Sequence, residues 1–566
     1  MATLPAASTT IDDEAGAFAG STGYCVVMGC TSSGTAAVPT VVASASAFYD
    51  EFGYSEAADY VALHIAATGL PVLFVKLTTA TVGVVGSEDA SGVTGTSVIT
   101  VSGTPLDEVD AVVTVVTGGT IGVNGITFNL SLDGGLTEKL IRLGTASTYV
   151  IPYVGMTLNF AAGTLVAADA FSFLSTAPMW DTTGLSAAKT ALVAQNKLTR
   201  SWVVIGDVPT DTVATLVTTQ VNAYETANDR FTYARINVSD RLPLARKSKV
   251  VGETLTFAEV GATGDTITRS AGSWIDDGFA VGDNFTVTGS VSNNITTTAG
   301  IATLSATVIT LGTDDLAAEV ATASTAITIT KTLTKAAWVT ATATEFAPID
   351  AQKRIDIGLG RARKLSPFTG YSPRRPIMWA ASIREYQHDL HIPCWRKQDG
   401  PLDGWSLLDE DGNLAEFDER VDGGGLAERF TCARSWGNGP NGTFIAMSLT
   451  RATEGSILSR TQNMAVANLA CTVVQAATEN AIGSVLQLDA DGHATAASLS
   501  VIEAAINTDL EIALLQAGTE GPRASYAVWR ASTTDVLNTV GATLTGVLDL
   551  RLNGTLEQIA TTVKVS

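Results

Sequence analysis

The most regular pattern of apolar and polar positions lies in the last twelve residues, 555–566. Apolar or β-branched side chains occupy alternate positions there, at Ile559, Thr561, Val563 and Val565. Such alternation is typical of a β-strand with one buried face. No turn follows that would bring back a hairpin partner. The segment is therefore expected either to be an edge strand of its own sheet or to be an arm that adds a strand to another molecule.

Helix-like and strand-like patterns follow one another in three stretches of the chain, residues 21–80, 181–249 and 336 onward. In the first stretch a helix is expected at Ala57–Ala67 and a buried strand at Val72–Val75. Later elements are expected as helices at Ile349–Lys364, Asn463–Asn480 and Ala497–Gln516, and as a strand at Ala524–Trp529. This rhythm favours a layered sheet with helices packed on it.

Two other stretches, residues 81–180 and 250–335, are rich in threonine, valine and glycine and carry few charges. Short strand patterns such as Ala111–Val116 are separated by turns such as 133–135, Asp-Gly-Gly. Each stretch is expected to be an all-β domain. Such domains are tolerated as insertions in surface loops, because closing a longer loop costs little entropy.

The predicted fold class is therefore mixed α/β (α+β), with a discontinuous layered core, two inserted all-β domains and extended arms at both ends. The expected segments are an N-terminal arm 1–20, a first core segment 21–80, a first β domain 81–180, a second core segment 181–249, a second β domain 250–335, a third core segment 336–485, a C-terminal α/β domain 486–554 and a C-terminal strand-exchange arm 555–566.

Composition narrows the classes of function. The chain has 566 residues, is 46% hydrophobic and only 16% charged, and has a net charge of −22. It is long enough for several domains and too apolar to be disordered throughout. Because nucleic-acid binding needs a basic surface, nucleic acid is not an expected partner.

Neither a targeting signal nor a membrane span is predicted. Residues 1–20 lack a basic region and an apolar core, and no run of about twenty residues is continuously apolar. The five cysteines are scattered and form no paired motif, which is typical of a protein that folds in a reducing compartment such as the cytoplasm.

No catalytic motif is found, and the chain is expected not to be an enzyme and to need no cofactor. His388, His391 and Cys394 have a spacing that could bind a metal on one helical turn, but Pro393 interrupts the helix there, so no metal site is predicted. The acidic segment 409–413 lacks the order of ligands in a calcium loop and is expected to be a hairpin turn.

A basic run stands out in this acidic chain. It contains Lys353, Arg354, Arg361, Arg363, Lys364, Arg374 and Arg375. Association of many copies with a charge of −22 is easier if positive and negative patches meet, so the run is predicted to be an electrostatic interface between subunits. The alternative is a solvated surface without a partner.

Three regions carry a resemblance to the contractile-tail sheath proteins of bacteriophages, of the kind found in Mu-like phages and other myophages. They are the segments 37–75, with Ala37-Val-Pro-Thr40 and Gly69-Leu-Pro-Val-Leu-Phe-Val75; 418–452, with Arg434-Ser-Trp-Gly-Asn438 and Ser448-Leu-Thr-Arg-Ala452; and the helix, strand and extended tail at the C-terminal end. The resemblance covers the α/β stretches, about two-thirds of the chain.

The resemblance implies a structural subunit that polymerises as stacked hexameric rings around a tail tube and contracts to drive the tube through the host envelope during genome ejection. It also implies tail tube, baseplate and tail terminator proteins as partners, a place in the virion after assembly in the host cytoplasm, and no protease activity. Two other hypotheses stay open: a surface adhesin or other virion binding protein built from the β domains, and a divergent hydrolase using His388 or His391.

Overall fold

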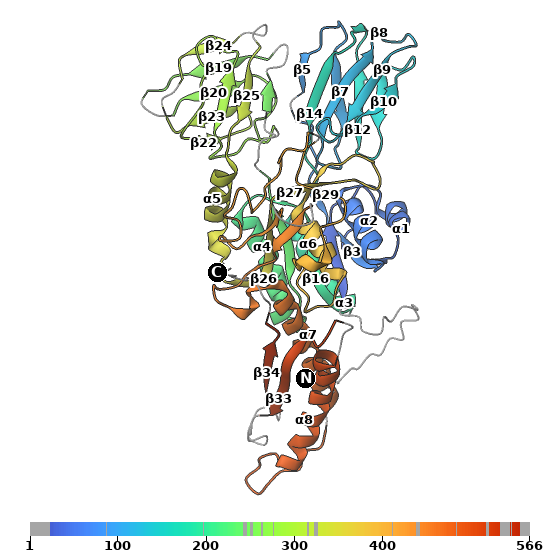
Figure 1. The fold of residues 1–566 in the computed structure, drawn as a ribbon, viewed down its shortest axis with the longest axis vertical. Helices are drawn as coiled ribbons and strands as arrows, with labels where there is room; N and C mark the ends of the chain where they lie inside the picture. The colour runs from blue at the N-terminus through green and yellow to red at the C-terminus, as the bar shows by residue number, and fades with distance from the viewer. Residues whose placement is uncertain are drawn as a thin grey trace, which may run out of the picture.

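A computed structural model gives the arrangement of the elements (Figure 1). It describes residues 23–86, 88–195, 197–240, 246–248, 253–261, 264–275, 277–313, 316–321, 326–409, 411–436, 442–482, 484–516, 520–531, 544 and 546–554. Two β-rich regions lie at one end of an elongated molecule, an α/β core occupies the middle, and the elements α7, α8, β33 and β34 form the other end.

The core is built on one mixed sheet. Its strands follow the order β2-β3-β1-β16-β17-β26-β30-β31, and β32 also pairs with β26. In this order, each strand from β3 to β30 is parallel to the next one. The other pairs are antiparallel: β2 with β3, β31 with β30 and β32 with β26. The bounds are β1 Tyr24–Gly29, β2 Pro39–Val42, β3 Val72–Lys76, β16 Thr199–Val208, β17 Ala234–Val238, β26 Gln352–Leu359, β30 Thr431–Arg434, β31 Phe444–Met447 and β32 Thr450–Arg451.

Helices cover both faces of this sheet. Alternate residues of β1 face opposite layers: Cys25 and Val27 pack with α1, α2 and α6, whereas Val26 and Met28 pack with α3, α4 and α5. The helices are α1 Ala45–Phe52, α2 Glu56–Thr68, α3 Thr182–Gln195, α4 Asp211–Thr226, α5 Lys335–Phe346 and α6 Ile377–Tyr386. Because both faces are buried, the central strands are largely apolar, and the charged residues within them, such as Arg235 and Asp356, pair with each other.

The first β-rich region leaves the core after β3 and returns before α3, through the antiparallel pair of β4 (Thr79–Thr81) and β15 (Met179–Trp180). Its main sheets have the orders β10-β9-β7-β14-β5 and β11-β12-β6. Its apolar side chains join the same hydrophobic cluster as core residues such as Phe48 and Tyr371. The bounds are β5 Asp89–Gly92, β6 Ile99–Gly103, β7 Asp110–Thr117, β8 Gly119–Thr120, β9 Thr127–Ser131, β10 Lys139–Arg142, β11 Thr148–Ile151, β12 Met156–Phe160, β13 Thr164–Leu165 and β14 Ala170–Leu174.

The second β-rich region lies between β17 and α5. Its sheets have the orders β22-β23-β20-β19-β24 and β18-β25-β21. Its buried side chains, which include Trp274 and Phe285, form a cluster of their own. The bounds are β18 Arg246–Ser248, β19 Leu255–Ala258, β20 Thr266–Arg269, β21 Phe285–Thr288, β22 Ile301–Leu304, β23 Val308–Leu311, β24 Glu319–Ala321 and β25 Thr328–Lys331.

At the opposite end, α7 (Thr461–Ala481) and α8 (Ala496–Leu510, continued by a π-helical turn Glu511–Leu515) pack against the antiparallel pair β33 (Ala524–Ala531) and β34 (Gly546–Leu552). Trp529, Ile506 and Leu510 are buried between them. Remaining short strands, β27 Arg361–Lys364, β28 Arg374–Pro376 and β29 Trp405–Ser406, pair near the core.

The predicted mixed α/β fold is confirmed at this level, and one predicted element is wrong. The helix expected at Ile349–Lys364 is instead β26 followed by β27. The run is a central strand of the sheet, and Ile355 and Ile357 lie on the same face because side chains alternate along a strand. The division of the chain into eight segments stays a proposal.

Candidate functional site

The C-terminal sheet is the first candidate for assembly. The arm residues Ile559, Thr561, Val563 and Val565, as well as the arm 1–20, lie outside the described residues. The strands β33 and β34 are described, however, and they pair with each other in a sheet of two strands.

The outer edge of β33 is covered by side chains of α8. Asn507 accepts a hydrogen bond from the Trp529 N–H (2.7 Å) and donates one to the Trp529 carbonyl (3.0 Å). Glu503 accepts from the Ala531 N–H at 2.8 Å. These side chains occupy the backbone groups of Trp529 and Ala531 that another strand would use, so this end of the edge is closed to strand addition.

The outer edge of β34 differs. In an antiparallel pair, opposite residues alternate between exchanging two hydrogen bonds and exchanging none. Trp529 bonds outward, so its partner Leu548 and the next residue of the same type, Leu550, direct their N–H and C=O groups to the outer edge of β34. No described residue bonds to these groups. The side chains of Leu548 and Leu550 are half-buried on the helix-facing side, so an added strand would extend an existing apolar layer.

The basic run divides into two groups in the structure. Arg354, Arg361, Arg374 and Arg375 are buried or nearly so and pair with carboxylates of the same chain, whereas Lys353 is exposed and Arg363 and Lys364 are half-buried. The pairing partners are distant in sequence, such as Glu225 for Arg354 and Asp107 for Arg375. The predicted electrostatic interface between subunits therefore stays a prediction for Lys353, Arg363 and Lys364, while the four arginines have an interior role.

Two of these arginines meet at the carboxyl ends of the parallel strands. Arg361, which follows β26, bonds to Asp207 of β16 and, at 3.0 Å, to Glu108. Arg374 bonds to Asp240, which follows β17, and to Glu416 at 2.5 Å. Burial raises the pKa of Asp207 to about 6, although the charge of Arg361 opposes the shift.

A cleft of about 740 Å³ opens above this charged cluster, between the core and the two β-rich regions. Its lining includes the acidic residues Glu56, Glu108 and Asp207 and the apolar residues Val82, Ile275 and Val281. In open α/β sheets, ligands commonly bind at this edge, outside the carboxyl ends of the strands.

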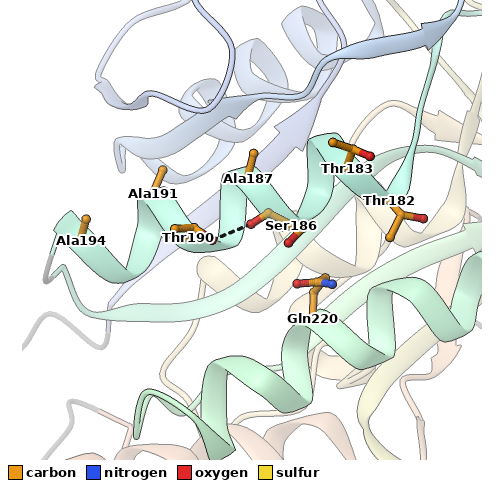
Figure 2. Close-up of a pocket in the computed structure, with 8 residues that line it drawn as sticks. All are labelled: Thr182, Thr183, Ser186, Ala187, Thr190, Ala191, Ala194 and Gln220. Carbon is orange, nitrogen blue, oxygen red and sulfur yellow. Dashed lines mark hydrogen bonds between the residues drawn. The ribbon is translucent and has the colours of Figure 1, made fainter.

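A groove of about 740 Å³ lies over helices α3 and α4 (Figure 2). Its lining is small and uncharged: Thr182, Thr183, Ser186, Ala187, Thr190, Ala191, Ala194 and Gln220. The Thr190 hydroxyl donates to the Ser186 carbonyl at 2.9 Å, which uses its proton within the helix. The lining therefore supplies neither an acid–base pair nor an activated nucleophile.

The residues considered for catalysis or metal binding have other contacts. His388 lies between Asp399 (3.3 Å) and Glu520 (3.6 Å), and His391 and Cys394 are not part of this contact. Burial raises the pKa of the Cys394 thiol to about 12, which makes it a poor nucleophile and metal ligand. Among the described residues, no group of three or more His, Cys, Asp or Glu side chains is placed to hold a metal ion.

The acidic segment forms the predicted hairpin. Leu408 and Leu414 pair antiparallel, and the Asp409 N–H donates to the Asn413 carbonyl at 2.9 Å. The Asp409 carboxylate accepts from the Asn413 N–H at 2.8 Å, so it stabilises the turn. Within the residues that the structure describes, no helix is both long and apolar enough to cross a membrane.

The fold and these sites define a layered α/β protein that carries β-rich regions and a strand, β34, whose outer edge bonds to no described residue. Two solved structures match it over nearly their whole length. A sheath tail protein from Listeria innocua is 8% identical, with 93% of this chain and 94% of that chain covered and a TM-score of 0.38. A sheath tail protein from Desulfitobacterium hafniense is 7% identical, with 98% and 100% covered and a TM-score of 0.38. No protein-family model matches the chain, and no curated protein matches it in sequence.

Proposed function

We propose that this protein is the structural subunit of a contractile phage tail sheath. It polymerises around a tail tube and contracts to drive the tube through the host envelope. The observation that carries the proposal is the outer edge of β34, to which no described residue bonds, together with the alternating apolar positions of the segment 555–566.

Strand addition suits a lattice that must shorten without coming apart. Hydrogen bonds between backbones give the affinity, and alternate side chains give the register. An extended arm of twelve residues spans at most about 40 Å, which is enough to bridge neighbouring subunits. The paired strands stay together while the chain that leads to them absorbs the change in subunit position.

The remaining features of the proposal follow from the resemblance of the sequence to sheath proteins. The subunit forms hexameric rings stacked in a helical array and meets tail tube, baseplate and tail terminator proteins. It assembles in the host cytoplasm, becomes a component of the virion and acts without enzymatic activity.

Removal of residues 555–566 tests the arm. We expect a folded, soluble subunit that no longer polymerises, as judged by circular dichroism, sedimentation and electron microscopy. The full-length chain is expected to form hollow cylinders under the same conditions. Normal cylinders from the truncated chain would refute strand exchange by this arm, and a stable full-length monomer would favour a binding protein instead.

The acceptor edge is tested by Leu550→Pro. The Leu550 N–H points away from β33, so proline removes a donor from the outer edge and leaves the β33–β34 ladder intact. We expect loss of polymerisation with little change in the fold. Leu550→Ala is the matched control, because it also loses the leucine side chain but keeps the N–H. Equal assembly of the two variants would show that β34 is not the acceptor.

A further inference from the structure

One buried arginine holds three carboxylates at the joint between the core and the first β-rich region. Arg375 contacts Asp107 through both terminal nitrogens (2.5 and 2.7 Å), Glu56 at 3.5 Å, and Asp59. The side chains of Asp59 and Asp107 are at most 1% exposed, and that of Glu56 is 10% exposed.

These groups come from different regions of the protein. Glu56 and Asp59 belong to α2 of the core, Arg375 belongs to β28, and Asp107 lies between β6 and β7 of the first β-rich region. The Tyr54 hydroxyl donates to Asp107 at 2.6 Å. The cluster therefore links α2 directly to the β-rich region.

The charges in this joint do not balance. One guanidinium neutralises one carboxylate, so three ionised carboxylates would leave two negative charges in the interior. The next cation, Arg361, is bonded to Glu108 and Asp207. Three carboxylates that share one buried guanidinium do not all stay ionised, because a single positive charge compensates neither their desolvation nor their mutual repulsion.

We propose that this cluster is a proton-dependent joint, which holds a proton on Glu56 at neutral pH and loosens the first β-rich region from the core when that proton is lost. Glu56 is the member of the three that reaches solvent, because it lines the cleft between the core and the β-rich regions. The proton can therefore exchange through the cleft without unfolding.

The direction of the effect follows from the pKa shifts. Burial, with the charge of Asp107 next, raises the pKa of Glu56 from 4.5 to about 8, and burial raises that of Asp59 to about 6. The folded state thus binds a proton that the unfolded state has released. The stabilisation of the folded state by this proton is complete below pH 4.5 and is lost as the pH rises towards 8. For one proton, the unfolding constant rises by up to about tenfold for each pH unit in this range.

The test compares the full-length chain with Glu56→Gln, which imitates the protonated side chain. Near pH 4 the two proteins are expected to melt within about a degree of each other, and near pH 8 the variant is expected to melt several degrees higher. Amide hydrogen exchange, corrected for its intrinsic rate, is expected to quicken between these pH values in α2 and residues 104–110 of the wild type only. Glu51→Gln, an exposed change on α1, is the control and should follow the wild type.

Parallel pH profiles of Glu56→Gln and the wild type would overturn the proposal. A second measurement does not depend on the variant. Infrared difference spectra of the wild type between about pH 6 and about pH 9 should show a buried carboxylic acid becoming a carboxylate. Absence of that band would also overturn the proposal, even if the variant did not fold.

Discussion

Replacing Glu385 by glutamine is expected to destabilise the core strongly. Glu385 is buried and accepts from Arg200 (3.0 Å), from Arg235 and from the Tyr233 hydroxyl (2.7 Å). Asp356 lies 3.4 Å from Arg235, so two arginines and two carboxylates balance in this cluster. Although burial alone would raise it, the pKa of Glu385 is held below its usual value by the charges of Arg235 and Arg200.

The magnitude follows from the charge left behind. Glu385→Gln keeps the shape of the side chain and removes its charge, so one of two buried guanidinium groups loses its counter-ion. Breaking a buried pair in this way costs about 3–5 kcal/mol. For a unit of 150–250 residues, each kcal/mol corresponds to about 2–4 °C, so the melting temperature is expected to fall by about 6–20 °C.

Differential scanning calorimetry at neutral pH, at one scan rate, measures this change. Glu454→Gln, in a turn of the chain away from the cluster, is the control. A Glu385→Gln protein that melts within about 2 °C of the wild type would refute the charge balance described for this cluster. The comparison with Glu56→Gln is informative, because the same chemical change is expected to stabilise the unbalanced cluster at Arg375 and to destabilise the balanced one at Glu385.

Two further predictions concern other regions of the chain. Replacing residues 250–332 by a short linker should leave the rest of the chain folded, because that region has its own hydrophobic cluster. Replacing residues 82–178 should prevent folding, because those residues share a cluster with α1 and α2. Circular dichroism and limited proteolysis measure the outcome, and the same behaviour of both deletion variants would contradict the prediction. His64→Leu should raise the free energy of unfolding by about 1 kcal/mol or more, because neither ring nitrogen bonds to any described residue. Burial lowers the pKa of His64 to about 3, so the wild type should lose stability as pH falls from 6.5 towards 3, and the variant should lose less; equal acid melting profiles would refute this.

Local periodicity in the sequence predicts the type of several elements. The strand expected at Val72–Val75 is β3, and the helix expected at Ala497–Gln516 is α8 with its π-helical turn. The segment Ile349–Lys364, predicted as a helix, is instead a strand because β26 pairs with β17 and β30, which are distant in sequence. Tertiary context decides such segments.

The roles of the basic residues were beyond the reach of the sequence for a similar reason. A cluster of cations in one stretch predicts a charged surface. Asp107, a carboxylate that pairs with the buried Arg375, is more than 260 residues away from it along the chain. Glu225, which pairs with Arg354, is more than 120 residues away. No spacing rule along the chain connects such pairs. The closed end of the β33 edge is likewise visible only once Asn507 is seen beside Trp529.

These placements change which contact is suited to join copies of the chain. Copies with a net charge of −22 repel one another, and four arginines of the basic run are paired with carboxylates inside each copy, so they do not offset the repulsion. Strand addition needs no complementary charge, because backbone groups supply the bonds. The arm 555–566 contains one acidic side chain, Glu557, and one basic side chain, Lys564, so its side-chain charges balance. Under the proposed function, an arm with balanced side-chain charges and a β34 edge that bonds to no described residue make the backbone, rather than ion pairs, the physically favoured link between subunits.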